Sequence, residues 1–217
     1  MRPDGAAGRR GPDPEALNWT GDSPRSPHAA TALPAATDLW KPVLVRAAVA
    51  LVFGAVTVFW AAPSVPGMGW AGGLYLLASG VVLAWSVKKT GLPHGTGAAK
   101  ALAAAGAVLT GTGAAVGLIP GSLVFGIVGA LGLGLAGAAE LYLGVATRRR
   151  SVLARDWIAS GVIGLGTAAA LPFFIELGPH ALLGVAGGGA IISGVLWTLA
   201  GLTLRHDARG VSAEAVN

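Results

Sequence analysis

Apolar runs close to 20 residues long fill most of the chain between residues 42 and 204. Charged residues or turns rich in Pro and Gly separate these runs. Because an α-helix rises 1.5 Å per residue, about 20 residues cross a hydrocarbon core of roughly 30 Å. Only 12% of the 217 residues are charged, whereas soluble domains carry roughly 25%. The pattern predicts an all-α integral membrane protein.

The lengths and boundaries of the apolar runs predict six transmembrane helices. They are expected over residues 42–60, 70–87, 100–119, 121–146, 157–175 and 181–204. Residues 1–40 are polar and rich in Pro, and they lack the apolar stretch of about 7 to 15 residues that marks a signal peptide. We expect them to form a disordered cytoplasmic tail, unless a partner orders it. The membrane domain would then span residues 41–205, followed by a short cytoplasmic tail over residues 206–217.

The positions of the basic residues predict the orientation in the membrane. All 15 Lys and Arg residues fall on one side of a six-helix arrangement, and the three opposite loops contain none. The positive-inside rule makes the basic side cytoplasmic, so we expect a multi-pass protein of the cell (inner) membrane with both termini in the cytoplasm. Although the net charge is +5, this placement argues against a nucleic-acid partner. We expect the basic loops to fix topology and to contact anionic lipid of the bilayer.

The tryptophans support the same orientation. Trp40, Trp85 and Trp157 would lie near the cytoplasmic interface, and Trp60 and Trp70 near the outer one. Amphipathic rings favour the level of the lipid headgroups. We therefore interpret them as interfacial anchors and not as a surface that stacks a ligand.

Several classes of chemistry are disfavoured by what the chain lacks. It has no cysteine, so thiolate metal sites and cysteine nucleophiles are excluded. Its four histidines are scattered without metal-ligand spacing, and no serine has His and Asp partners arranged for catalysis. Residues 132–137 match G-x-G-x-x-G, but they lie within an apolar helix and do not follow a strand. We expect no enzymatic activity, no cofactor and no metal.

A helical hairpin is repeated three times, over residues 41–89, 98–150 and 155–205. Gly80, Gly137 and Gly194 are separated by 57 residues each, and Gly54 matches Gly111 at the same spacing. Two helices per copy make the repeats parallel. Small residues let helices approach closely in lipid, so we expect Gly80, Gly137 and Gly194 to be packing glycines. The motifs Gly113-x3-Gly117 and Gly184-x3-Gly188 suit the same use, and a homo-oligomer or a complex with another membrane protein stays open.

Two segments carry a resemblance to a known family. The first is "LVRAAVALVFGAVTVFWAAPS" (residues 44–64), with its Arg, its mid-helix Gly and its Trp before Pro. The second is "LAGAAELYLGVATRRR" (residues 135–150), a Gly-x-x-Glu helix that ends in a basic cluster. Together they resemble the HdeD-like family, acid-resistance membrane proteins built from tandem two-helix repeats. The resemblance implies a role in membrane stress or acid tolerance.

Glu140 is an acid within an apolar run. It precedes the basic cluster by about two helical turns, which places it roughly 10 Å below the cytoplasmic interface. A charge there costs a few kcal/mol unless it is paired or protonated. We predict an intramembrane ion pair between Arg46 and Glu140, with Tyr142, Ser79 or Ser193 as lesser partners. The pair could fix helix packing, Glu140 could couple protons or ions, or both side chains could reach the interface independently.

Two further features bear on function. In the repeat alignment, Glu140 occupies the position of Leu83 and Trp197. Glu176 and His180 are the only ionisable residues of the outer loops, where a His with a pKa of about 6.5 would be either solvated or part of a pH sensor.

We predict a non-enzymatic membrane protein of a stress or acid-tolerance response. The alternative is a small transporter or channel in which Glu140 couples protons or ions.

Overall fold

The computed structural model describes residues 39–89, 96–149 and 151–214, with side chains as far as residue 209. Within these residues every regular element is a helix and there is no strand. The predicted N-terminal tail lies outside the described residues apart from Leu39 and Trp40, and Trp40 already begins the first helix.

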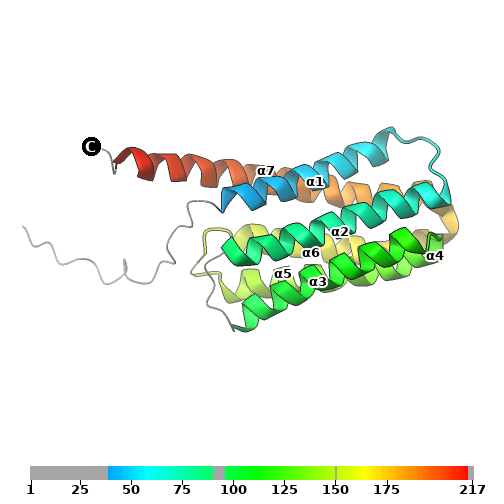
Figure 1. Cartoon of the computed structure of the whole chain (residues 1–217), viewed down its shortest axis with the longest axis horizontal. Helices are drawn as coiled ribbons and strands as arrows, with labels where there is room; N and C mark the ends of the chain where they lie inside the picture. Colours follow the sequence, from blue (N-terminus) through cyan, green and yellow to red (C-terminus); the bar gives the residue numbers. More distant parts are fainter. Residues whose placement is uncertain (1–38, 90–95, 150, 215–217) are drawn as a thin grey trace, which may run out of the picture. The chain divides into compact units, whose positions relative to one another are not determined.

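The described residues form a bundle of long helices joined by short turns (Figure 1). In chain order the elements are α1 (Trp40–Phe59), α2 (Val65–Lys89), α3 (Gly97–Leu118), α4 (Ser122–Val124), the π-helical turn η3 (Phe125–Gly129), α5 (Ala130–Ala146), α6 (Ala154–Ala170), the 3-10 segment η4 (Leu171–Leu177) and α7 (Gly178–Glu214). Elements α4, η3 and α5 make one continuous helical segment, Ser122–Ala146.

Five helical segments are long and apolar enough to cross a membrane, which indicates a membrane protein. Four of them match the first four predicted helices to within a few residues. The fifth, Ala154–Arg209, has 56 residues and contains both remaining predictions. It is interrupted at η4 and at Gly178, whose φ of 85° is left-handed. Figure 1 shows the chain reversing there, so that α7 returns beside α6.

Helix-capping residues explain why two helices begin earlier than predicted. The Ser64 carbonyl accepts a hydrogen bond from the Met68 amide at 2.9 Å, and its Oγ accepts from the Gly67 amide at 3.1 Å. At α3, Thr96 Oγ1 accepts from the Ala99 amide at 3.3 Å. Such hydroxyl caps satisfy amides that the first turn of a helix leaves unpaired. At the other end of the chain, α7 continues beyond residue 204 to Glu214 and takes in most of the predicted C-terminal tail.

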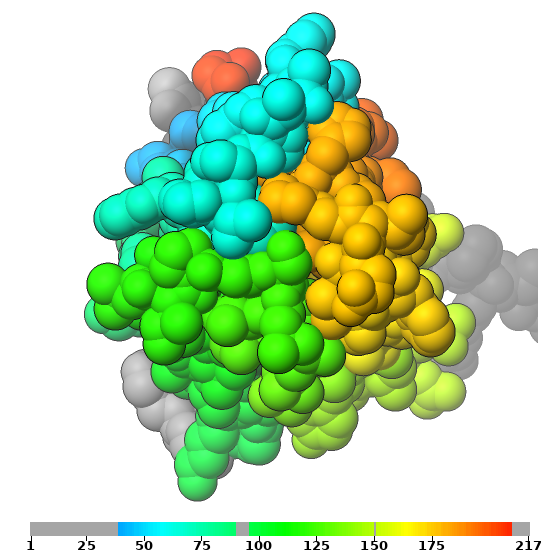
Figure 2. Space-filling model, turned by 90° about the vertical axis from the view of Figure 1, so that its right-hand side faces the viewer, coloured from blue at the N-terminus to red at the C-terminus, as the bar shows by residue number. Residues whose placement is uncertain are grey.

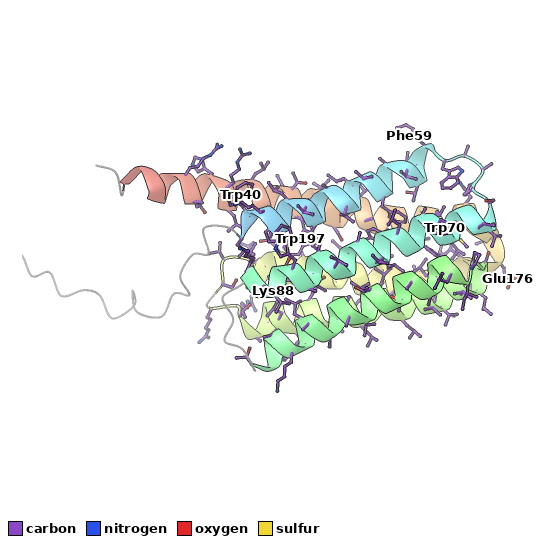
Figure 3. The ribbon with its side chains drawn as sticks, in the orientation of Figure 1. Trp40, Phe59, Trp70, Lys88, Glu176 and Trp197 are labelled. Atoms are coloured by element: carbon purple, nitrogen blue, oxygen red, sulfur yellow. The ribbon has the colours of Figure 1, made fainter. Side chains whose placement is uncertain are left out.

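Large apolar side chains cover the outside of the bundle. Phe59 is 86% exposed, Phe173 81% and Leu74 68%. A soluble protein would bury such side chains, whereas lipid solvates them. Figure 3 shows Trp40 and Lys88 at one end of the bundle and Phe59, Trp70 and Glu176 at the other. Trp157 departs from its predicted place in an interfacial belt, because it is only 4% exposed and lies inside the bundle.

The closest helix packing occurs in three pairs: α2 with α3, α5 with α6, and α7 with α1. Each pair joins the second helix of one predicted hairpin to the first helix of another. Viewed from the end that carries the α1–α2, α3–α4 and α6–α7 connections, these connections gather around a common centre (Figure 2). The interior of the bundle is therefore shared by segments far apart in the sequence.

Candidate functional site

Arg46 of α1 and Glu140 of α5 meet inside the bundle. Nη2 of Arg46 donates a hydrogen bond to Oε1 of Glu140, and the two side chains form an ion pair. The Glu140 side chain is 3% exposed and the Arg46 side chain 17%, so the acid is the more deeply enclosed partner. Burial of this kind removes both charges from water, which makes each depend on the other.

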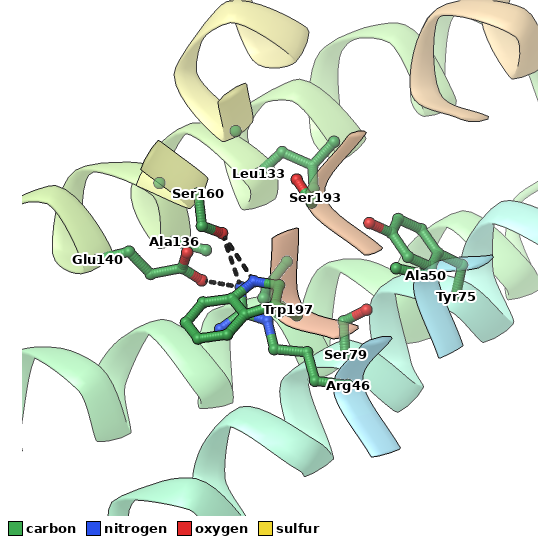
Figure 4. A pocket seen from close by; sticks show the side chains of 13 residues that line it. Arg46, Ala50, Tyr75, Ser79, Leu133, Ala136, Glu140, Ser160, Ser193 and Trp197 are labelled. Atoms are coloured by element: carbon green, nitrogen blue, oxygen red, sulfur yellow. Dashed lines mark hydrogen bonds and ion pairs between the residues drawn. The ribbon is translucent and has the colours of Figure 1, made fainter. Parts of the chain in front are cut away.

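Two further polar groups extend this contact to the third hairpin. Ser160 Oγ of α6 accepts a hydrogen bond from Trp197 Nε1 of α7 at 3.1 Å and lies 3.4 Å from Arg46 Nη2 (Figure 4). One serine therefore joins the arginine to the indole. The resulting cluster is formed by side chains of α1, α5, α6 and α7, and we call these four residues, Arg46, Glu140, Ser160 and Trp197, the polar cluster.

Two indole rings lie beside the guanidinium of Arg46. Its Cζ lies 4.6 Å from the ring centroid of Trp197 and 5.5 Å from that of Trp157. The two rings meet edge to face, with centroids 5.0 Å apart and an interplanar angle of 73°. Cations are attracted to the faces of aromatic rings, more strongly when desolvated. The two rings, both buried, therefore help to hold the arginine in place.

A cavity of about 50 Å³ adjoins the polar cluster. Hydroxyl-bearing side chains of α2 and α7 line it together with Arg46 and Glu140, and apolar residues of α3 and α5 complete the wall (Figure 4). These hydroxyl groups belong to Tyr75, Ser79 and Ser193. Nη1 of Arg46 is buried, and no atom of the described residues accepts a hydrogen bond from it. One donor of the only arginine in the cavity wall is thus left without a protein partner.

The lesser partners predicted for Glu140 divide into two groups. Ser79 and Ser193 line the cavity, as does Glu140 itself. Tyr142 does not, because its side chain lies on the outer face of α5 and is 53% exposed. Ser160, Trp157 and Tyr75 were not predicted. All three side chains lie on the inward faces of their helices. Which face of a helix points inward depends on how the helices pack, so these residues carried no direct signal in the sequence.

The three predicted packing glycines all lie in close helix pairs. A Cβ on Gly80 would lie 2.6 Å from the Gly106 carbonyl oxygen of α3, and one on Gly137 would lie 2.9 Å from the Gly161 carbonyl oxygen of α6. A Cβ on Gly194 would instead meet the Leu51 side chain of α1 at 2.8 Å. These glycines therefore permit backbone approach that a methyl group would obstruct.

Other glycine predictions were wrong or only partly correct. Gly113 packs against Leu77 and Gly73 of α2, and the backbone of Gly117 also lies close to Gly73. Gly184 and Gly188 make no such contact within the described part of the chain, because a Cβ on either would meet no atom there within 4 Å. Gly54 is buried beside Ile191 of α7, whereas its proposed counterpart Gly111 faces outward. The 57-residue spacing thus relates the second helices of the hairpins better than it relates the first helices.

The predicted pH-sensing pair lies at the opposite end of the bundle from the basic loops. Glu176 belongs to η4 and His180 to the first turn of α7, and both side chains are exposed. Neither lines the cavity beside Glu140. Among the described residues, no group of three or more potential metal ligands occurs. Of the two predicted pairs of charged or titratable residues, only Arg46 and Glu140 are buried together in the bundle.

Chemically, the polar cluster combines one carboxylate, one guanidinium and neutral hydrogen-bonding groups. It can hold a charge pair, accept a proton on Glu140, and orient a small polar species in the cavity. Comparisons of the chain with protein-family profiles, with characterised proteins and with solved structures found no match.

Proposed function

We propose that the chain is a six-span protein of the cell (inner) membrane, of the HdeD-like kind, that contributes to acid or envelope stress tolerance without catalysing a reaction. The proposal adds a sixth crossing by dividing Ala154–Arg209 at η4 and Gly178. Two observations support this division. The chain reverses direction at η4 and Gly178, and basic residues lie at or near the ends of α2, α3, α5 and α6 on the same side of the bundle as Trp40. Both termini are then cytoplasmic, and the basic loops contact anionic lipid.

The topology can be tested with single cysteines, because the chain has none of its own. We expect a membrane-impermeant maleimide to label His180→Cys in intact cells. Asp207→Cys and Ser151→Cys should be labelled only after the membrane is opened. If Asp207→Cys reacts from outside while Ser151→Cys does not, α6 and α7 make a single crossing and the six-span proposal fails.

The role we assign to the Arg46–Glu140 pair is structural. A single observation carries this assignment: the polar cluster ties together side chains of four helices, with two indole rings packed beside the guanidinium. A pair fixed from so many directions suits a lock on helix packing better than a mobile carrier. Buried polar contacts of this kind have been used to specify one arrangement of helices over others.

Acid survival of a deletion strain tests the cellular role. We expect the wild-type chain to restore survival after acid challenge. The charge-exchanged variant Arg46→Glu with Glu140→Arg should restore more function than either single change. Membrane levels of each variant, measured by immunoblot, separate loss of protein from loss of function. Full survival in the deletion strain would overturn the acid-tolerance role.

The cavity favours one second candidate, a small transporter or channel in which Glu140 couples protons or ions. The specific observation is that Glu140 lines a cavity with hydroxyl groups and an unpartnered guanidinium donor. Intramembrane acids of transporters face such spaces. Proteoliposomes loaded with a pH-sensitive dye would show proton flux in the wild type that Glu140→Gln abolishes. Equal dye responses in wild-type, Glu140→Gln and empty vesicles would exclude this candidate.

A further inference from the structure

Arg46 uses only part of its hydrogen-bonding capacity within the bundle. Its Nη2 donates a hydrogen bond to Glu140 and lies within 3.4 Å of Ser160 Oγ. Its buried Nη1 has no acceptor among the described residues. An unpaired buried donor costs about 1–3 kcal/mol, and more when it belongs to a charged group. The Arg46 guanidinium can therefore donate a hydrogen bond to one more acceptor.

We propose that the cavity beside the polar cluster is a binding site for a monovalent anion of halide size, and that the anion binds when Glu140 carries no charge. The proposal rests on the cavity and on Arg46, and it does not depend on the acid-tolerance role. It gives the ion pair a second state in which the counter-ion of Arg46 is no longer Glu140.

The balance of charge around the cavity decides when an anion can bind. While Glu140 is ionised, the pair is neutral, and a second anion would be repelled by the carboxylate. When Glu140 is protonated or replaced by Gln, the Arg46 charge is left uncompensated in surroundings of low dielectric constant. A halide ion would restore neutrality. Anion binding and loss of the Glu140 charge therefore favour each other reciprocally.

No other described group in the cavity wall supplies a charge that could replace this effect. The titratable groups that face Glu140 are Arg46 of α1 and the Tyr75 phenol of α2. The wall contributed by α3, α6 and α7 consists of apolar side chains, serines and Trp197. Serine hydroxyls and the indole carry no charge, so within the described wall the carboxyl of Glu140 is the group whose charge is set against that of Arg46.

The size and donors of the cavity suit a small anion. A water molecule needs about 10–15 Å³ of such space, and the cavity offers about 50 Å³, which leaves room for the somewhat larger halide ions. Arg46, Ser79 and Ser193 line it and carry hydrogen-bond donors. Hydroxyl hydrogens rotate to meet an acceptor.

Thermal unfolding of the full-length chain in detergent at pH 7 tests the proposal. Sodium chloride is compared with sodium gluconate at equal ionic strength, using wild type, Glu140→Gln and the double variant Arg46→Gln with Glu140→Gln. The matched control is Glu176→Gln, which makes the same change at an exposed acid far from the cavity. Chloride should raise the Tm of Glu140→Gln by about 3–6 °C for each tenfold increase above half-saturation.

Chloride should leave the wild type, the control and the double variant at the Tm that they have in gluconate. An equal chloride response in the double variant would overturn the proposal, because Arg46 is the group that holds the anion. Absence of a chloride response in Glu140→Gln would overturn it as well. If Glu140→Gln folds in neither salt, Glu140→Ala takes its place. Failure of both to fold in chloride would count against the proposal, since the anion is expected to replace the carboxylate charge.

Discussion

The glycine contacts between helices and the polar cluster illustrate two ways in which the same bundle is held together. At Gly80, Gly137 and Gly194 the three second helices of the hairpins carry the same small residue, and each approaches a neighbouring helix closely. At the next inward position, three residues later, the same helices carry Leu83, Glu140 and Trp197, all of them buried. Similar backbone surroundings therefore accommodate three chemically different side chains.

This difference indicates that packing and chemistry are separable in this bundle. The glycines act through the absence of a side chain, so what matters is the identity of the atoms across the contact. The residues of the polar cluster act through specific hydrogen bonds and charges, so what matters is whether each partner is present. Variants of the two regions should consequently respond to different kinds of substitution.

The largest effect is expected when one partner of the ion pair is removed. Arg46→Leu or Glu140→Leu should each lower the free energy of unfolding in detergent by about 3–5 kcal/mol, because the remaining charge is buried alone. The double variant Arg46→Leu with Glu140→Leu should lose much less than the sum of the two. A double variant as unstable as the sum would show that the pair makes no net contribution through its mutual contact.

Alanine at the packing glycines should give the next largest effect, and the order should follow the atoms opposed to the new methyl group. Gly80→Ala and Gly137→Ala press against backbone atoms of α3 and α6, so we expect losses of about 1–3 kcal/mol. Gly194→Ala meets a leucine side chain that can move, so its loss should be smaller. Denaturant titration of the three variants gives the order, and equal losses would contradict this account.

Removing one hydrogen bond from the polar cluster should cost less again. Trp197→Phe keeps an aromatic ring near Arg46 but deletes the donor to Ser160, for a loss of about 0.5–1.5 kcal/mol. Trp70→Phe is the matched control, because Trp70 is 67% exposed at the surface. A loss at Trp70 equal to that at Trp197 would show that ring size alone, and not the contact with Ser160, determines the result.

The smallest effect is expected at glycines that contact nothing. A methyl group on Gly111, Gly184 or Gly188 would meet no atom within 4 Å. Alanine there should therefore be neutral or should stabilise the helix by up to about 1 kcal/mol, since glycine lowers helix stability. Destabilisation of Gly184→Ala in detergent that depends on protein concentration would instead identify that face of α7 as a contact between copies of the chain.

The length and composition of the apolar runs determined the helical class and the first four helices, because crossing a membrane forces every backbone amide into a helix of fixed minimum length. The last two predicted helices fall within one long apolar segment, which the structure divides at η4 and Gly178. Sequence also selected Arg46 and Glu140 as partners, because a charge in lipid must find the nearest opposite charge.

The remainder of the candidate site depends on which face each helix turns inward. Trp157 and Ser160 resemble residues of an interface and a lipid-facing surface when only their position along the chain is considered. The packing of α6 in the bundle places Ser160 in the polar cluster and Trp157 beside Arg46. Likewise, the glycines at 184 and 188 form a packing motif in the sequence but face outward on α7. The amino-acid sequence thus determined which segments are helical and that Glu140 needs a cation, because both follow from the cost of polar groups in lipid. Only the tertiary structure decided which serines, tryptophans and glycines surround that pair, because apolar helices rich in Gly and Ala carry no periodic signal that distinguishes an inner face from an outer one.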